Sequence, residues 1–286
     1  MLLNMKELLK VANENQFAVP AFNISDYSMF NGVMDICEKS KTPVIIAIHP
    51  DELSHITVDA VCGIRERALS SKIPVCIHLD HGSSIPQILT AIQCGFTSVM
   101  IDGSTLPFDK NINLCKEVVA LAHSVGVSVE GELGTIGAVD AYGESGADVI
   151  IYTNPDDAVI FVEKSGVDTL AVAIGTSHGI YPKDMKPKLE LDLLRQISEK
   201  VKVPLVLHGG SNNSDVEVAK AVTLGVSKVN ISSDIKVAYY DKMREVLKEL
   251  EVREPNVIQP PCEEALKKVA LHKIRLFKAE GKAVLY

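Results

Sequence analysis

The stretch that indicates the fold most clearly reads IPVCIHLDHG and spans residues 73–82. It is apolar as far as Leu79, apart from His78, and then ends in an acid, a histidine and a glycine. A run that is almost wholly apolar is typical of a strand buried on both faces of a parallel sheet. Seven further short runs, rich in β-branched residues, have the same form, at residues 17–23, 42–49, 97–102, 127–132, 168–174, 203–208 and 227–232.

Amphipathic segments separate these runs, and several of them end at a glycine, which is a common helix stop. Alternating strands and helices indicate parallel strands joined by right-handed crossovers. Eight such units predict an α/β fold, a single-domain (β/α)8 TIM barrel over residues 1–286, with an N-terminal helix and a C-terminal helical extension. The alternative is a doubly wound open sheet, which usually has a glycine-rich phosphate loop after its first strand. Residues 22–28, FNISDYS, contain no such loop.

The composition excludes several classes of protein. With 286 residues, of which 47% are hydrophobic, the chain can form one large domain. Its net charge of −8 argues against a nucleic-acid partner, and no apolar run approaches the roughly 20 residues of a membrane span. The N-terminal segment lacks the basic start and the cleavage site of a signal peptide, and the six scattered cysteines form no CxxC pair. We therefore expect a cytoplasmic protein with reduced cysteines.

Polar side chains gather at the carboxyl ends of the predicted strands. In a TIM barrel these ends share one face, on which such enzymes place their active sites. Six of the eight ends carry an acid or a histidine, whereas a random placement would scatter these residues over helices and loops. The polar residues at the strand ends are Asn23, His49, Asp80, His81, Asp102, Glu132, His178, His208 and Asn230.

Three of these histidines indicate a metal site. His81, His178 and His208 follow the third, sixth and seventh strands, and each precedes a glycine, which lets backbone approach a ligand closely. Neutral imidazole is a good zinc ligand, and three protein ligands leave one position open for a substrate. The alternative is that each histidine is an ordinary strand-end residue. His78 points to the same side of its strand as Asp80, either as a partner of the site or as part of the barrel core.

Asp80 and His81 are neighbours in the chain, although successive side chains of a strand point to opposite faces. Both can reach one site only if the strand bends between them. We therefore predict that the strand ends or breaks at Asp80–His81 and that Gly82 permits the turn.

The segments after the last two strands predict a phosphate site. Residues 208–215 read HGGSNNSD, and residues 230–234 read NISSD. The loops after strands seven and eight form the usual phosphate cradle of this fold, where glycine amides, serine hydroxyls and a helix N-terminus bind the anion. Simple helix capping is a compatible alternative, and its candidates are Asn213, Ser214, Asp215, Ser232 and Ser233.

At these positions the sequence resembles the class II, zinc-dependent ketose-bisphosphate aldolases, and most closely the branch of tagatose- and fructose-bisphosphate aldolases. The shared motifs occur in the family's order over nearly the whole chain, and their combination is highly specific. They are AFN (21–23), HLDHG (78–82), SVMIDGS (98–104), VEGELG (129–134), LAVAIGTSHG (170–179), PLVLHGGS (204–211) and KVNISSD (228–234).

The resemblance implies a reversible aldol cleavage of a ketose 1-phosphate or 1,6-bisphosphate into dihydroxyacetone phosphate and an aldehyde. It also implies a homodimer or homotetramer, and that His81, His178 and His208 bind one catalytic zinc ion. Asp80 would be the acid/base acting on the C4 oxygen of the sugar.

Further residues take their expected roles from the same resemblance. Asp102 and Glu132 would lie near an alternative or second metal position, and a monovalent cation often meets the Gly179 carbonyl in this family. The substrate would be held by Asn23, Gly179, Gly209, Gly210, Ser211, Asn230, Ile231, Ser232 and Ser233.

The chemistry of an aldol cleavage agrees with these residues. The reaction leaves a carbanion beside a carbonyl, which zinc can stabilise as a Lewis acid, while a carboxylate takes the proton from the C4 hydroxyl. The other way to stabilise this carbanion is a Schiff base between the substrate carbonyl and a lysine. Lys228 is early in its strand, and Lys72 and Lys202 precede theirs, so no lysine occupies a predicted strand end.

The sequence departs from the family's pattern in the loop after the fifth strand. The family carries a glutamate there that moves the proton at C3 of dihydroxyacetone phosphate. Asp140 is aligned with this glutamate, and Glu144, four residues on, is the alternative. Both could instead be solvated loop acids.

Two further departures concern the aldehyde half of the substrate. His49 and Pro50 stand where family members usually have a small residue. The histidine would therefore narrow the pocket beside the aldehyde product or change its charge. Asn256 stands where bisphosphate aldolases have an arginine for the distal phosphate, and only Arg253 is nearby. The substrate could therefore be a ketose 1-phosphate without a second phosphate. The sequence leaves open which ketose is cleaved and with which C4 stereochemistry.

Two other functions are compatible with a barrel. A non-catalytic aldolase subunit would be expected to lose zinc ligands or Asp80, and this chain keeps all four residues. A metal-dependent hydrolase usually carries an HxH pair at the end of its first strand, and this strand ends in AFN.

Overall fold

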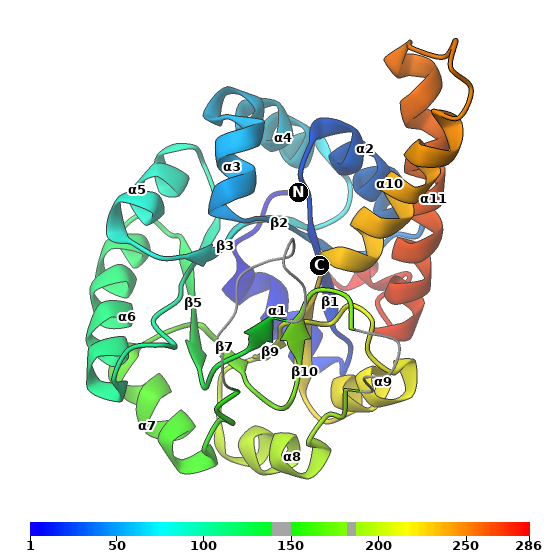
Figure 1. Cartoon of the computed structure of the whole chain (residues 1–286). Coiled ribbons are helices and arrows are strands. Elements are labelled where there is room, and N and C mark those ends of the chain that lie inside the picture. Colours follow the sequence, from blue (N-terminus) through cyan, green and yellow to red (C-terminus); the bar gives the residue numbers. More distant parts are fainter. Residues whose placement is uncertain (139–149, 182–186) are drawn as a thin grey trace.

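The computed structural model describes residues 1–138, 150–181 and 187–286 and contains a closed barrel of eight parallel strands (Figure 1). Around the barrel the strands follow the order β1-β10-β9-β7-β5-β4-β3-β2. Each overlaps one of the eight predicted runs, so the predicted (β/α)8 fold is confirmed. The strands are β1 Val19–Asn23, β2 Val44–Ile48, β3 Val75–Gly82, β4 Ser98–Ile101, β5 Ser128–Leu133, β7 Thr169–Val172, β9 Leu205–Leu207 and β10 Val226–Ile231.

Helices surround the barrel, and α1 contacts strands from different sides of it, β3, β5 and β10, across one end. Helices α10 and α11 pack against each other and project beyond the barrel (Figure 1). Among the described residues, no helix has the length and hydropathy that would let it cross a membrane. The helices are α1 Met5–Glu14, α2 Tyr27–Lys39, α3 Pro50–Ile56, α4 Val58–Ser70, α5 Ile85–Gln93, α6 Phe108–His123, α7 Pro155–Ser165, α8 Leu191–Lys200, α9 Asp215–Thr223, α10 Ser233–Val246, α11 Pro255–Leu276 and a final 3₁₀ turn, Lys282–Leu285.

The two faces of each strand have different surroundings, because successive side chains alternate. In β3, Ile77 and Leu79 belong to the hydrophobic core, in which the strands pack against the helices. The alternate residues His78 and Asp80 are fully buried and make polar contacts with side chains of other strands. Strand β3 therefore contributes an apolar face to the layer outside the barrel and a polar face to the barrel interior.

Strand β3 bends at the predicted place. Its pairing with β4 shifts register between Leu79 and Gly82, which is the mark of a bulge, and His81 has a φ of 52°. The predicted break at Asp80–His81 is thus confirmed, although the strand continues through Gly82. Gly82 takes part through its small size and not through its own φ, because the left-handed backbone belongs to His81. Gly82 is needed for space: a Cβ there would lie 2.7 Å from the Met100 carbonyl oxygen.

A second, two-stranded sheet accompanies the barrel and was not predicted. Its strands are β6, Gly137–Ala138, and β8, Ser177–His178, which pair in parallel with Ala138 opposite His178. The Tyr181 hydroxyl accepts a hydrogen bond from the Ser177 amide at 2.6 Å. This small sheet fixes the backbone of His178 beyond the end of β7.

We expect the Gly82→Ala variant to lose about 1–3 kcal/mol of unfolding free energy, the usual cost of forcing an extra methyl into a packed site. Its Cβ would also approach Leu79 Cδ2 to 2.9 Å. Urea denaturation measures the loss. The control is Gly63→Ala in α4, whose Cβ would meet only ordinary contacts at 3.6 Å or more, and which should not destabilise the protein. A Gly82→Ala variant as stable as the wild type would show that β3 and β4 can separate at no cost.

Candidate active site and metal centre

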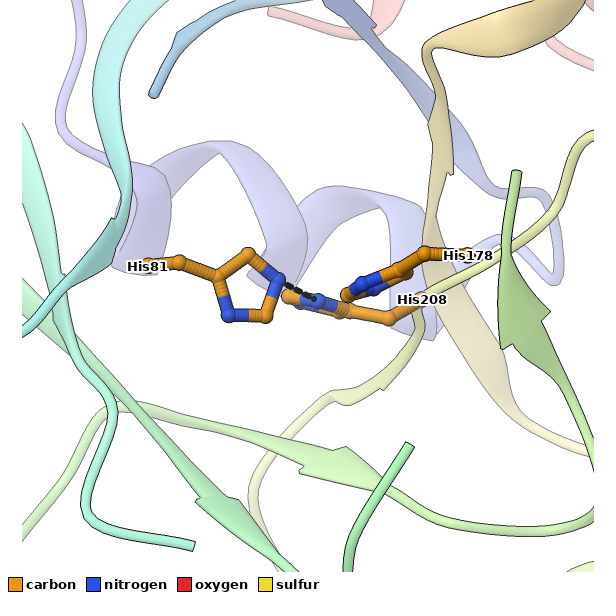
Figure 2. Close-up of side chains that lie close together, drawn as sticks. All are labelled: His81, His178 and His208. Atoms are coloured by element: carbon orange, nitrogen blue, oxygen red, sulfur yellow. Dashed lines mark hydrogen bonds between the residues drawn. The ribbon is translucent and has the colours of Figure 1, made fainter. Parts of the chain in front are cut away.

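Three histidines meet at the carboxyl-terminal end of the barrel (Figure 2). His81 comes from the bulge of β3, His178 from β8, and His208 directly follows β9. One ring nitrogen of each lies within 4.8 Å of those of the other two. The ring centroids of His81 and His208 are 4.6 Å apart, and those of His81 and His178 are 5.0 Å apart. The structure thus brings together the three histidines that the sequence singled out.

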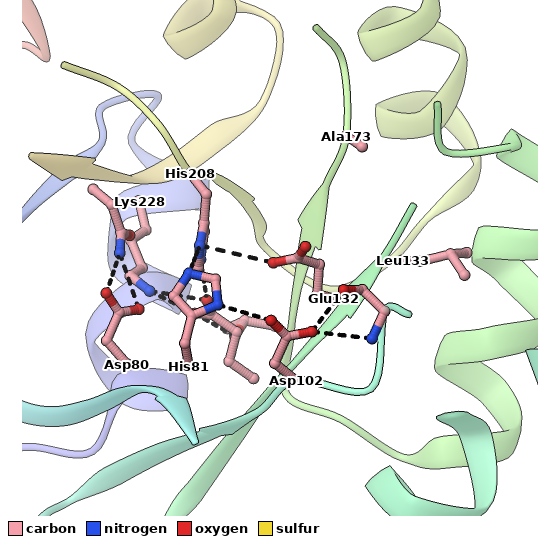
Figure 3. A network of polar contacts seen from close by, with 12 residues as sticks. Asp80, His81, Asp102, Glu132, Leu133, Ala173, His208 and Lys228 are labelled. Carbon is pink, nitrogen blue, oxygen red and sulfur yellow. Dashed lines mark hydrogen bonds and ion pairs between the residues drawn. The ribbon is translucent and has the colours of Figure 1, made fainter. Parts of the chain in front are cut away.

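Two of these rings are each held by a carboxylate. Asp102 Oδ2 lies 2.9 Å from His81 Nδ1 (Figure 3). Glu130 Oε1 lies 2.7 Å from His208 Nε2. The opposite nitrogens, His81 Nε2 and His208 Nδ1, are 2.8 Å apart. A carboxylate on the outer nitrogen orients a metal-ligating histidine and fixes its tautomer. Three imidazoles with two rings held in this way suit a zinc ion with one open position.

Two further acids lie beside this group, in different environments. Asp102 accepts hydrogen bonds from the amide and the hydroxyl of Ser104, at 3.0 and 2.7 Å. Glu132 is buried, and its Oε2 lies 3.8 Å from His208 Nδ1 but has no hydrogen-bond partner among the described residues. Burial and the nearby Asp102 charge raise the pKa of Glu132 well above its usual value. With His81, these acids form a second group whose donor atoms lie within 4.8 Å of one another.

The acids make the pocket favourable for positive charge. Burial disfavours a charged ring at His81, but the negative charges of Asp80, Asp102 and Glu132 outweigh it and raise the pKa of His81 to about 10. A site that favours a proton this strongly will also favour a divalent cation, because the same carboxylates stabilise both.

Asp80 is a fully buried carboxylate next to the histidines. Asn23 Nδ2 donates to its Oδ2 at 2.8 Å, and Asn230 Nδ2 lies 3.0 Å from both of its oxygens. Burial disfavours the charged form, but His81, His208 and Lys228 hold the pKa of Asp80 well below its usual range. Asp80 is therefore an ionised, oriented acceptor, which is the state that a general base requires.

The predicted phosphate residues lie where β8, β9 and β10 end. A Cβ on Gly209 would lie 2.7 Å from the Ser177 carbonyl oxygen, and the Gly210 amide donates to the Asn230 carbonyl at 3.1 Å. Ser211 Oγ accepts from the amide of Asp234 at 3.2 Å. These close contacts place the two glycines and the start of α10 at one corner of the barrel mouth.

The alternative prediction, that serine side chains in these loops cap the following helices, is wrong for the two serines at N-cap positions. Ser214 precedes α9 and Ser232 precedes α10, but neither side chain makes a capping hydrogen bond. Asn213 instead donates to the Ser211 carbonyl at 2.9 Å and so holds the loop. Gly179 follows His178 with a φ of 99°, and Ile231 packs in the core, so only the backbone of Ile231 can face a ligand.

The residues that depart from the family pattern are placed as follows. His49 Nδ1 accepts from the Asp51 amide at 3.2 Å, and its ring centroid lies 6.3 Å from that of His81. Arg253 is exposed, 3.9 Å from Glu254, in the turn at the outer end of the α10–α11 projection (Figure 1). Asn256 lies in the first turn of α11. Asp140 and Glu144 lie outside the described residues.

Two residues of the barrel interior were not predicted as part of the site. Glu130 and Lys228 are fully buried, and Lys228 Nζ lies 2.9 and 2.8 Å from the two carboxylate oxygens of Glu130. Each is a charged residue within a predicted buried strand, and this pattern in the sequence could have identified them. His78 also belongs to this interior group, since its Nδ1 lies 2.9 Å from Ser98 Oγ and its Nε2 3.4 Å from Lys228 Nζ.

Known proteins are similar to this chain over nearly their whole length. The D-tagatose-1,6-bisphosphate aldolase subunit GatY of Klebsiella oxytoca is 38% identical over 283 residues, which cover 98% of this chain and 99% of that protein. The YdjI aldolase of Escherichia coli K12 is 34% identical, with a TM-score of 0.86 and coverage of 99% and 100%. A fructose-bisphosphate aldolase of Campylobacter jejuni shares the fold, with 23% identity, a TM-score of 0.82 and coverage of 98% and 96%.

The family model for class II fructose-bisphosphate aldolases matches residues 3–282. This match covers nearly the whole chain, as the motifs predicted. The chain therefore belongs to the class II fructose-bisphosphate aldolase family and is an aldolase of the tagatose- and fructose-bisphosphate type, from a family of metal-dependent lyases.

Proposed function

We propose that this chain is a zinc-dependent aldolase that reversibly cleaves a ketose 1-phosphate or 1,6-bisphosphate into dihydroxyacetone phosphate and an aldehyde. The convergence of His81, His178 and His208 beside the ionised Asp80 carries the proposal. The family's metal dependence and the relatives' printed substrates support it. We further propose that it works in the cytoplasm as a homodimer or homotetramer.

The three histidines would hold the zinc ion, with Asp102 and Glu132 beside a second cation position. Bound there, the ion supplies a Lewis acid for the charge that develops on the ketose oxygen. Asp80 takes the proton from the C4 hydroxyl in cleavage and returns it in condensation. Asn23 and Asn230 orient Asp80, because their amides donate to its oxygens at 2.8–3.0 Å.

The phosphate of dihydroxyacetone phosphate would bind at the corner formed by β8, β9 and β10. Two observations support this assignment: the Ser232 side chain makes no capping hydrogen bond, and Ser211 lies at the N-terminus of α10, where its Oγ accepts from the Asp234 amide. Backbone amides at a helix start are a ready anion site. The residues proposed to contact the substrate are Asn23, Gly179, Gly209, Gly210, Ser211, Asn230, Ile231, Ser232 and Ser233.

Two parts of the substrate's chemistry depend on the chain's departures from its family. Asp140 is proposed to move the C3 proton, with Glu144 as the alternative. His49 would face the aldehyde half, because its ring lies near that of His81 at the barrel mouth. A histidine at this position, and asparagine at 256, favour a substrate whose distal end carries a polar group other than phosphate.

The His178→Ala variant should bind zinc far more weakly than the wild type, because one of three proposed imidazole ligands is lost. Metal-free protein titrated with zinc, followed by elemental analysis, gives the stoichiometry. The wild type should hold about one tightly bound ion per chain. The exposed His55 on α3 provides the control, since His55→Ala should bind like the wild type. Equal affinity in His178→Ala and wild type would remove this residue from the metal site.

Replacing Asp80 by alanine should reduce kcat for cleavage by about 10²- to 10⁴-fold, the usual contribution of a general base, and should leave bound zinc in place. The assay couples release of dihydroxyacetone phosphate to its reduction. Asp51→Ala, which changes an acid whose side chain is 94% exposed on α3, is the control. Full activity in Asp80→Ala would assign the proton transfer to another group.

A panel of substrates tests the aldehyde half. We expect tagatose and fructose 1-phosphates to be cleaved with a kcat/KM at least equal to that of the 1,6-bisphosphates, since Arg253 lies on the projecting turn rather than at the barrel mouth. The same coupled assay measures both series. A clear preference for the bisphosphates would mean that a distal phosphate is bound after all.

A further inference from the structure

We propose that the buried ion pair between Lys228 and Glu130 is a positioning device for His208, which sets the ring nitrogen that this histidine presents to the metal. The inference rests on the proposed metal site and adds to it two residues for which no role has been assigned above.

The ion pair lies in the interior of the barrel. Lys228 belongs to β10 and Glu130 to β5, two strands that are separated by β9 and β7 in the barrel order. Their contacts of 2.8 and 2.9 Å therefore cross the lumen, and neither side chain is exposed. Glu130 Oε1, which contacts Lys228 Nζ, also lies 2.7 Å from His208 Nε2.

The contact with Glu130 decides the tautomer of His208. An ionised carboxylate accepts hydrogen bonds and cannot donate them, so His208 Nε2 must carry the proton. The neutral ring then has its lone pair on Nδ1, which is the nitrogen that faces His81 Nε2 at 2.8 Å. His208 is thus prepared to bind a cation through Nδ1, and His81, held by Asp102 at Nδ1, faces this nitrogen with its Nε2.

Lys228 supplies the positive charge that this arrangement needs. His78, Asp80 and Glu130 form a buried group whose donor atoms lie within 4.8 Å of one another, a set that could itself attract a metal ion. The Lys228 ammonium occupies this region, bonded to Glu130 and 3.4 Å from His78 Nε2. The internal ammonium balances the Glu130 charge, so the carboxylate stays available to His208.

Stability alone does not account for this pair. Removing two charges from water costs more than a buried ion pair usually returns, and apolar residues of similar volume are often as good or better. The interior of a TIM barrel is ordinarily filled by branched apolar side chains. A positioning role for His208 explains why a charged pair stands in this place.

The experiment compares Glu130→Gln, Lys228→Met and the double variant Lys228→Met/Glu130→Leu with the wild type. The double variant leaves no unpaired buried charge and should fold even if a single variant does not. Thr169→Val is the matched control, because its hydroxyl lies 3.5 Å from Glu130 Oε2, whereas His208 contacts Oε1. Thermal unfolding of the metal-free proteins establishes which of them fold.

Two readouts are used, and neither depends on cleavage activity. Nitrogen-15 NMR of the histidine rings in metal-free protein reports the tautomer of His208, with His208→Gln to assign its signals. Competition with a chromophoric chelator gives the affinity for zinc.

The wild type and Thr169→Val should show one tautomer at His208, protonated at Nε2. The double variant should show a mixture and should bind zinc about 10- to 100-fold more weakly, the usual cost of losing such a partner. An unchanged tautomer and unchanged zinc affinity in the folded double variant would overturn the proposal. A wild type that binds zinc but cleaves no sugar phosphate would instead refute the proposed function and leave the role of the pair intact.

Discussion

The parallel direction of eight strands, combined with their two-residue side-chain period, is the constraint on which this molecule depends. Parallel closure places every carboxyl end at one mouth, and the period sends alternate side chains into the lumen. In β3 the side chains of Ile77 and Leu79 therefore pack toward the helices. Those of His78 and Asp80 point into the barrel interior. One extra residue at the bulge then adds His81 to the same side, so adjacent residues serve one site.

The environment of each acid, rather than its type, sets what it can do at this mouth. Asp102 is bonded to His81 and Ser104, which together hold the pKa of its carboxyl well below the usual value although burial opposes this. Glu132 lies one strand away, buried and without such donors, and its pKa is raised. The first is a permanent anion that orients a ring, whereas the second favours charge only when a cation arrives.

Most of the barrel could be predicted from the sequence, because strands buried on both faces leave continuous apolar runs such as VIIAI in β2. The histidines and acids at the strand ends could be found for the same reason, since they interrupt those runs. Strands β6 and β8 could not be predicted, because a strand of two residues is too short to show an alternating pattern of side chains. The pairing of Glu130 with Lys228 joins residues 98 positions apart, and only the closed lumen brings them together. The positive φ of His81 depends on packing that a local pattern does not contain.

The small sheet of β6 and β8 has a mechanical consequence. Ala138 and His178 are direct partners in it, and Ala138 stands two residues before Asp140 in the chain. A displacement of the Gly137–Ala138 backbone would therefore also displace the backbone of His178, one of the three proposed zinc ligands.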